Sequence, residues 1–319
     1  MLRGLIARAA AVETRYIFFS GKGGVGKTTI AASTAVWLAD HGLRTLLISI
    51  DLQPSLSDLF QQRISADETP VKGVAGLAAY SVEPATSLDR YRTKMADTLR
   101  VIDPQSMLLK QFGTDAEVEC GAPQASVYEL SYFLNHRGYD RIVFDTAPTG
   151  IHLEKILSQS KYAQAMTRQI RERQKEQRRS LALDSETSAL QQLMQLDEQA
   201  IVTMRSAETV FIMVCTPEAM PLAEVARNIP ILEQVYLIPV RGLVINRLIP
   251  PDACQGRRFW QQRSAMQRAY VERARTQFAS KDIGQAHLMP EVTGLGVLRH
   301  IGTDLYGNGV SEETYAFAR

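Results

Sequence analysis

The chain has 319 residues, 45 % of them hydrophobic and 22 % charged, which is the ordinary composition of a soluble globular protein. Its 36 basic and 34 acidic side chains give a net charge of +2, so the sequence offers no reason to expect a nucleic-acid partner. No apolar run reaches the roughly 18 residues of a membrane-spanning helix, and Arg3 and Arg8 interrupt the apolar N-terminal stretch. The three cysteines, Cys120, Cys215 and Cys254, are widely spaced and form neither a disulfide framework nor a C-x-x-C pair, so we expect a protein of the reducing cytoplasm.

Five short runs rich in β-branched and aromatic residues alternate with helical stretches along the chain. They lie at 16–20, 45–50, 141–145, 209–214 and 241–246. Continuous apolar runs of this kind are typical of parallel strands that are buried on both faces. The alternation predicts an α/β fold with a doubly wound, mostly parallel sheet, whose ligands bind at the carboxyl ends of the strands.

Residues 85–135 and 156–207 break this alternation, because their apolar side chains recur at spacings of three and four. We expect them to form one helical subdomain inserted into a nucleotide-binding core of residues 1–84, 136–155 and 208–319. Flexible thioethers can line an adaptable hydrophobic groove, and ordinary core packing explains them equally well. Five of the ten methionines fall in the insertions: Met95, Met107, Met166, Met194 and Met204.

Residues 21–29 read GKGGVGKTT and match the P-loop pattern between a predicted strand and a predicted helix. Glycines in such a loop let backbone N–H groups close around phosphate oxygens. Lys27 is placed to neutralise the β- and γ-phosphates of ATP, and Thr28 offers its hydroxyl to Mg²⁺. The residues assigned to the nucleotide are Gly21, Gly23, Gly24, Val25, Gly26, Lys27, Thr28 and Thr29.

Lys22 is a second lysine that the P-loop pattern does not require. It stands on the outer rim of the loop, where its own nucleotide is a poor match for its reach. A lysine there could extend across a two-fold axis to the phosphates of a partner subunit and act like an arginine finger. The alternative is a solvated lysine.

Two aspartates follow predicted strands. Asp51 comes after the run 45–50, where a carboxylate can orient the attacking water or accept its proton. Asp145 ends the run 141–145 and would bind Mg²⁺ directly or through its waters. For both residues, capping of the strand end is the alternative.

With these motifs, the chain resembles the arsenite-pump and tail-anchored-protein-targeting ATPases, P-loop proteins whose loop carries a signature second lysine. The resemblance extends over about residues 15–300. Six segments carry it: GKGGVGKTT (21–29), IDLQPSLSDLF (50–60), VFDTAPTG (143–150), VCTPEAMPLAEVAR (214–227), VINRLIP (244–250) and HLMPEVTGLGVL (287–298).

The resemblance implies a role for each matching position. Lys22 would cross the interface of a homodimer, Asp51 would activate water in switch I, and Asp145 would lie near Mg²⁺ in switch II. Asn246 would read the adenine base, its alternative being a turn residue that ends a strand. The remaining implied nucleotide contacts are Glu224, at the subunit interface, and Pro290 and Glu291, in a loop that closes over the base.

The chain departs from this family at both switches and at its cysteines. Switch I reads DLQP where the family usually has DPAH, and Ile151 displaces His152 by one position in switch II. Cys254 stands alone where targeting members carry a C-x-x-C pair, so a Cys₄ zinc site is not expected. Trivalent arsenic needs about three soft thiolates, and the helical insertions offer Cys120 alone. A buried small hydrophobe is the other interpretation of Cys120.

The resemblance implies a Mg²⁺-dependent homodimeric ATPase, which converts ATP and water to ADP and phosphate. Its nucleotide-driven opening and closing would handle a hydrophobic transmembrane segment, as in a targeting factor. The first alternative is an ATPase subunit that drives a membrane permease for arsenite or another anion, and the second is a partition or division-site ATPase. We expect a location in the cytoplasm or at the membrane periphery, and no nucleic-acid partner.

Overall fold

The computed structural model describes residues 14–50, 55–83, 85–87, 89–90, 93, 129–146 and 198–307. The chain divides into two compact units. The core unit comprises Met1–Ser81, Gly138–Thr149 and Arg205–Arg319, and the insertion unit comprises Val82–Arg137 and Gly150–Met204. None of the helices in the described ranges combines the length and the apolar character needed to cross a bilayer.

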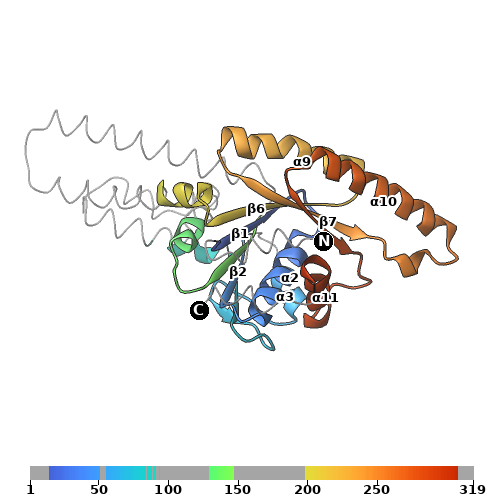
Figure 1. The fold of residues 1–319 in the computed structure, drawn as a ribbon. Coiled ribbons are helices and arrows are strands. Elements are labelled where there is room, and N and C mark those ends of the chain that lie inside the picture. Colours follow the sequence, from blue (N-terminus) through green and yellow to red (C-terminus); the bar gives the residue numbers. More distant parts are fainter. Residues whose placement is uncertain are drawn as a thin grey trace, which may run out of the picture. The chain divides into compact units, whose positions relative to one another are not determined.

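The core unit is built on a sheet that has eight strands within the described residues, in the order β3-β4-β2-β5-β1-β6-β7-β8 (Figure 1). Neighbouring strands pair in parallel except for β3 and β4. This arrangement confirms the predicted α/β fold with a mostly parallel sheet. The strands are β1 (Tyr16–Ser20), β2 (Thr45–Ser49), β3 (Thr69–Pro70), β4 (Leu77–Ser81), β5 (Arg141–Asp145), β6 (Thr209–Cys215), β7 (Val240–Leu248) and β8 (Asp282–His287).

All five predicted strands are present, as β1, β2, β5, β6 and β7. The sequence analysis gives no expectation for the other three strands, the two-residue β3, β4 and β8. Strand β4 reads LAAYS, whose two alanines give little β-propensity, and it forms through its pairing with β2. Strand β8 reads DIGQAH and lies at the edge of the sheet. An edge strand pairs with a neighbour on one side only, so it can form without a continuous apolar run.

Helices cover both faces of this sheet. Figure 1 shows α2, α3 and α11 together on one face, and α9 and α10 on the other. The described helices of the core unit are α2 (Lys27–Asp40), α3 (Ser55–Phe60), α9 (Ala219–Pro230), α10 (Arg258–Gln277) and α11 (Leu295–Tyr306), with a π-helical turn, η2 (Ile231–Val235), and a 3₁₀ turn, η3 (Pro251–Cys254).

Helix α2, which follows the P-loop, is buried nearly all round between the sheet and α11. Gly302 of α11 packs so closely that a Cβ there would lie 3.2 Å from the Cβ of Trp37. The hydroxyls of Thr34 and Tyr306 form a hydrogen bond of 2.5 Å between the same two helices. Because α2 is held on both sides, it gives the P-loop a fixed base.

On the other face, three phenylalanines align the central strands. The ring of Phe18 on β1 stacks between Phe144 on β5 and Phe211 on β6, with centroid distances of 4.3 and 4.5 Å. Phe18 is also the register partner of both residues in the sheet. A one-residue slip would move these rings to the opposite face, so the stack fixes the strand ends that form the site.

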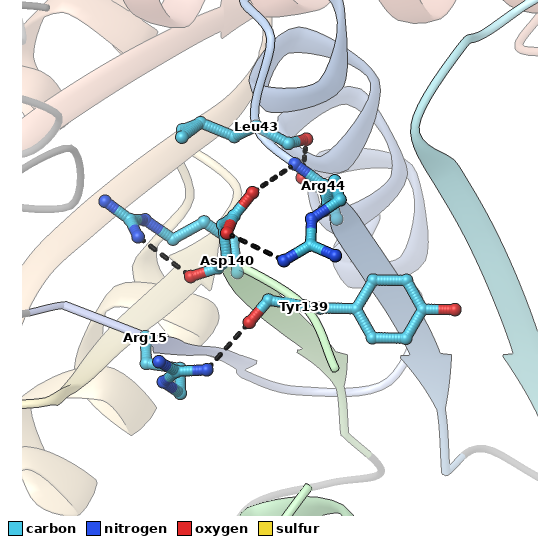
Figure 2. A network of polar contacts seen from close by, with 7 residues as sticks. Arg15, Leu43, Arg44, Tyr139 and Asp140 are labelled. Atoms are coloured by element: carbon cyan, nitrogen blue, oxygen red, sulfur yellow. Dashed lines mark hydrogen bonds and ion pairs between the residues drawn. The ribbon is translucent and has the colours of Figure 1, made fainter. Parts of the chain in front are cut away.

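At the amino ends of the strands, a polar network joins β1, β2 and β5 (Figure 2). The carboxylate of Asp140 accepts a hydrogen bond of 2.8 Å from the Arg44 amide and also faces the Arg44 guanidinium at 3.5 Å. Arg15 donates to the Tyr139 carbonyl at 2.8 Å. These contacts hold the amino ends of the three strands together, and this fixes the relative positions of their carboxyl ends at the opposite edge of the sheet.

In the insertion unit, the described residues include helical stretches at 129–134 and 198–204. Met204 is only 1 % exposed, so core packing accounts for this methionine and a groove wall does not. The other four methionines of the insertions lie outside the described residues, as does Cys120. The boundaries of the helical subdomain stay a prediction.

Candidate active site

The P-loop joins β1 to α2, and two of its glycines, Gly21 and Gly26, have no room for a side chain. A Cβ at Gly21 would overlap the carbonyl oxygen of Val214 on the adjacent strand β6. Gly26 has a left-handed φ of 91°, and a Cβ there would overlap the side-chain nitrogen of Asn246. The loop therefore passes against β6 and β7, at the carboxyl edge of the sheet.

The loop separates its two lysines. Lys27 is 6 % exposed, and its Nζ donates to the carbonyl of Lys22 at 3.2 Å. The Lys22 side chain is 44 % exposed on the rim, and its Nζ lies 4.0 Å from a carboxylate oxygen of Glu224 on α9. The structure thus brings Lys22 and Glu224 together within one chain, while the Lys27 amine points back under the loop.

The first turn of α2 lies beside these lysines. Its N-cap is Gly26, which has no side chain, so no cap side chain accepts from the first backbone N–H groups. Those groups and the positive end of the helix dipole form an anion site. Thr28 and Thr29 lie in this turn and are partly exposed.

Asn246 contacts the P-loop directly. Its Nδ2 donates to the Val25 carbonyl at 2.9 Å, and its Oδ1 accepts from the Arg247 amide at 2.8 Å. The residue is 5 % exposed and lies within β7, so it is not a turn residue. An amide has two N–H donors and two oxygen lone pairs, so it keeps one of each for another partner.

Asp145 ends β5 with no exposed surface. One carboxylate oxygen accepts from the Ser49 hydroxyl at 3.2 Å, and the carbonyl accepts from the Ile50 amide at 2.9 Å. The next residue, Thr146, donates from its hydroxyl to the Phe19 carbonyl at 3.0 Å. Asp51, which follows Ile50, lies outside the described residues, so its position in the site stays a prediction.

The chemistry of these donors fits Mg²⁺. Asp145 supplies a carboxylate and Thr28 a hydroxyl, and Mg²⁺ prefers such hard oxygen ligands. A fully buried carboxylate is costly unless hydrogen bonds or a cation compensate its charge. The hydroxyl of Ser49 supports Asp145 and was not among the predicted site residues, because its only signal in the sequence is a serine that closes the apolar run TLLIS.

Pro290 and Glu291 are both exposed, in the loop between β8 and α11. The ends of this loop are fixed: the Leu288 amide donates to the Leu248 carbonyl at 2.7 Å, and the Gly294 amide donates to the Leu59 carbonyl at 2.8 Å. The described contacts do not bring either residue to the P-loop, and their role toward the base stays a prediction.

Two of the three cysteines are described. Cys215 is buried at the end of β6, and burial raises the pKa of its thiol to about 12. Cys254 is half-buried, and its Sγ faces the carbonyls of Pro250 and Trp260 at 3.7 Å. Within the part of the chain that the structure describes, no three His, Cys, Asp or Glu side chains cluster as a metal site would require.

The chain is similar to known ATPases along most of its length. A family model described as anion-transporting ATPase matches residues 14–307. A protein of Halobacterium salinarum named "Putative arsenical pump-driving ATPase" is 31 % identical over 310 residues, which cover 94 % of this chain and 46 % of that protein. The chain therefore spans about half the length of this relative.

Two eukaryotic relatives have lengths closer to that of the chain. "ATPase ASNA1 homolog 1" of Paramecium tetraurelia is 30 % identical over 276 residues, which cover 81 % of this chain and 82 % of that protein. "ATPase GET3A" of Arabidopsis thaliana is 31 % identical over 302 residues, which cover 89 % of this chain and 82 % of that protein. All three relatives are named as ATPases. The region that the family model matches includes the P-loop, Asp145 and Asn246.

Proposed function

Because the chain belongs to the anion-transporting ATPase family and is therefore an ATPase, we propose that it acts as a Mg²⁺-dependent homodimer that handles a hydrophobic segment of a membrane protein. The observation that carries the ATP-dependent dimer in this proposal is the separation of the two P-loop lysines. Lys27 is buried beneath the loop, and Lys22 is half-exposed on its rim. One lysine serves the chain's own nucleotide, and the other stands where a second subunit can approach.

ATP binding begins with an exchange of hydrogen-bond partners at Lys27. Its Nζ leaves the neutral Lys22 carbonyl, 3.2 Å away, for charged phosphate oxygens, which are stronger acceptors. The uncapped N–H groups at the start of α2 add further donors. Asn246, which is already bonded to the loop at Val25, offers its remaining donor and acceptor to the adenine edge.

Hydrolysis requires a water in line with the bond that breaks. Asp51 orients or deprotonates this water, whose oxygen attacks the γ-phosphorus while the bridging oxygen leaves with ADP. The hydrogen bond from Ile50 to the Asp145 carbonyl ties the chain just before Asp51 to β5. Mg²⁺, held by Thr28 and Asp145, would neutralise charge on the phosphate oxygens. Lys22 of the second subunit adds positive charge from across the interface.

The helical insertions supply the cargo surface in this proposal. Within the described part of the insertion unit, Tyr132 and Val202 are large apolar side chains that are 50 % and 67 % exposed. A transmembrane helix of about 20 residues is about 30 Å long, which one subunit's helices cover poorly and two facing subunits cover better. Closure on ATP and opening after hydrolysis would therefore control capture and release.

The chemistry of the described thiols favours this role over arsenite efflux. Trivalent arsenic binds thiolates, and the burial that raises the pKa of Cys215 to about 12 keeps that thiol protonated. Cys254 faces two carbonyls of its own turn. The efflux role remains the second candidate because the Halobacterium relative is described as driving an arsenical pump.

One experiment separates the two roles. The purified protein is mixed with a transmembrane peptide or with arsenite, and its ATP turnover is measured. Peptide co-purification is compared between the ATP-bound and the ADP-bound protein. We expect the peptide to co-purify with an ATP-trapped Asp51→Asn variant and not with the ADP form. Tyr132→Asp and Val202→Asp should weaken capture, whereas Phe259→Asp, an equally exposed position in the core unit, should not. Turnover that rises with arsenite and depends on Cys120 would replace targeting with efflux.

A further inference from the structure

Strand β7 is irregular just after Asn246. Its pairing with β8 breaks register between Ile245 and Leu248. Arg247, in the break, has a φ of 61°, in the left-handed region that residues with a side chain rarely adopt. Such a conformation persists only where surrounding contacts enforce it, so some group must hold Arg247 in place.

That group is Gln267 of α10. Its Nε2 donates to the Arg247 carbonyl at 3.1 Å, and its Oε1 accepts from the Ile249 amide at 2.8 Å. The side chain is 4 % exposed, and both ends of its amide are used. A primary amide donates and accepts at the same time, which is what a backbone carbonyl and a backbone N–H on either side of an irregular turn require.

The hydrogen bonds continue from this turn to the P-loop. The Arg247 amide donates to Asn246 Oδ1 at 2.8 Å, and Asn246 Nδ2 donates to the Val25 carbonyl at 2.9 Å. The left-handed turn at Arg247 therefore sets which way the Asn246 amide faces. If Arg247 relaxed to an ordinary strand conformation, its N–H would turn and Asn246 could rotate.

We propose that Gln267 is a positioning residue for base recognition, which clamps the β7 irregularity so that the Asn246 amide presents one fixed donor and one fixed acceptor to the purine. The substrate class that this selects is an adenine nucleotide, since adenine offers an amino donor beside a ring-nitrogen acceptor where guanine reverses the two. The inference rests on the proposed function, because it takes Asn246 as the residue that reads the base.

The test compares ATP with GTP in three variants. Gln267→Met removes both hydrogen bonds, and its side chain has room because Gln267 lines a cavity of about 630 Å³ with Leu248 and Ile249. Gln262→Met is the matched control, because Gln262 is an exposed amide on the same helix. Asn246→Ala is the reference for lost base recognition. In each variant, kcat and KM are measured for both nucleotides, with the melting temperature alongside.

We expect Gln267→Met to raise the KM for ATP roughly three- to tenfold, the usual effect of one lost hydrogen bond, with little change in kcat. Its preference for ATP over GTP should fall toward that of Asn246→Ala, and the double variant should lose no more than Asn246→Ala alone. Gln262→Met should behave as wild type. A Gln267→Met protein with a lowered melting temperature but an unchanged ATP preference would overturn the proposal.

Gln267→Glu adds a readout that a purely structural role would not move. A protonated carboxylic acid donates and accepts as the amide does, whereas a carboxylate would face the Arg247 carbonyl without a proton. Burial raises a glutamate pKa, to about 8–9 in documented cases, so we expect the ATP preference of this variant to be lost at about pH 10 and to recover as pH falls to about 7. A preference that stays at the wild-type value throughout would contradict the clamp, and this variant decides the matter where Gln267→Met does not fold.

The two proposals fail in distinguishable ways. If Asn246→Ala keeps the wild-type preference for ATP, Asn246 does not read the base, and both the base-reading role and the role of Gln267 are wrong. If Asn246→Ala loses the preference and Gln267→Met keeps it, base reading stands and only the clamp is wrong.

Discussion

Lys22 and Glu224 lie 4.0 Å apart in one chain, joining the rim of the P-loop to helix α9. The lysine proposed to reach a partner's phosphates is therefore held by its own subunit. Because the Lys22 side chain is 44 % exposed, such a pair contributes only about 0.2–1 kcal/mol. The tether is thus weak enough for a partner's phosphates to break it.

Glu224→Gln should release this tether. We expect the protein concentration that gives half-maximal ATP turnover to fall by up to about fivefold. This change corresponds to about 1 kcal/mol, the upper end of what an exposed ion pair contributes. The difference should shrink in high salt, which screens exposed pairs. Glu218→Gln is the matched control, since Glu218 pairs with Arg263 at 2.8 Å just before α9. Loss of ATP binding in Glu224→Gln would instead assign Glu224 to the nucleotide itself.

Asp51→Asn tests whether Asp51 is the general base for the attacking water. The amide cannot accept the water's proton, so we expect turnover to fall by roughly 10²-fold or more with ATP binding retained. Single-turnover kinetics and equilibrium binding of ATP measure the two effects separately. Turnover near the wild-type rate would remove Asp51 from the mechanism.

A heterodimer tests whether Lys22 acts in trans. One subunit carries Lys22→Ala and the other carries Asp51→Asn. If Lys22 serves the partner's nucleotide, the subunit with intact Asp51 receives its lysine from the other chain, and one of the two sites works. If Lys22 acts within its own chain, both sites are defective. Activity of heterodimers isolated with two different affinity tags decides between these outcomes.

Gly26→Ala should destabilise the protein in the absence of nucleotide. Alanine pays roughly 1–2 kcal/mol for a left-handed backbone, and its Cβ would overlap the Asn246 side chain. We expect the melting temperature to fall by roughly 4 °C or more. Gly23→Ala is the control, because a Cβ there has nothing within 4 Å, and its melting temperature should change by no more than roughly 2 °C.

The buried thiol of Cys215 predicts a loss of stability at high pH. Its pKa rises from 9.0 to about 12 on folding because burial disfavours the thiolate. Stabilisation by this group is therefore complete below about pH 9 and is lost as pH rises toward 12. Urea unfolding of wild type and Cys215→Ala at pH 8 and pH 10.5 should show the wild type losing more stability than the variant. Equal losses would mean that the thiol is not buried in solution.

The sequence predicted those parts of the fold that rest on local chemistry. The P-loop and α2 follow from glycine geometry and an apolar helix within one short stretch, and the five central strands follow from their unbroken apolar runs. Strand β8 could not be predicted, since its polar residues form a strand only through their pairing with β7. Its edge position depends on the whole sheet order.

The site divides in the same way. Lys22, Lys27 and Asn246 belong to recognisable motifs, and the structure brings all three to the P-loop. Gln267 had no signal, because one glutamine in a polar helix looks like any solvated side chain. Its role comes from contacts made 20 and 18 positions away, at Arg247 and Ile249. Met204 shows the converse: helical spacing marked its face, and only the tertiary fold decides that this face is buried.

The cover that α11 places over α2 has a consequence for how the protein is made. Thr34 and Tyr306, whose hydroxyls join the two helices, are separated by 272 positions. At about 5–20 residues per second, the ribosome completes this cover roughly 15–50 s after the P-loop helix has emerged. For that interval the nascent chain exposes the side of α2 that includes Trp37 and Ser33. A chaperone at the exit tunnel, or a pause late in translation, would therefore change how long this side of α2 stays uncovered.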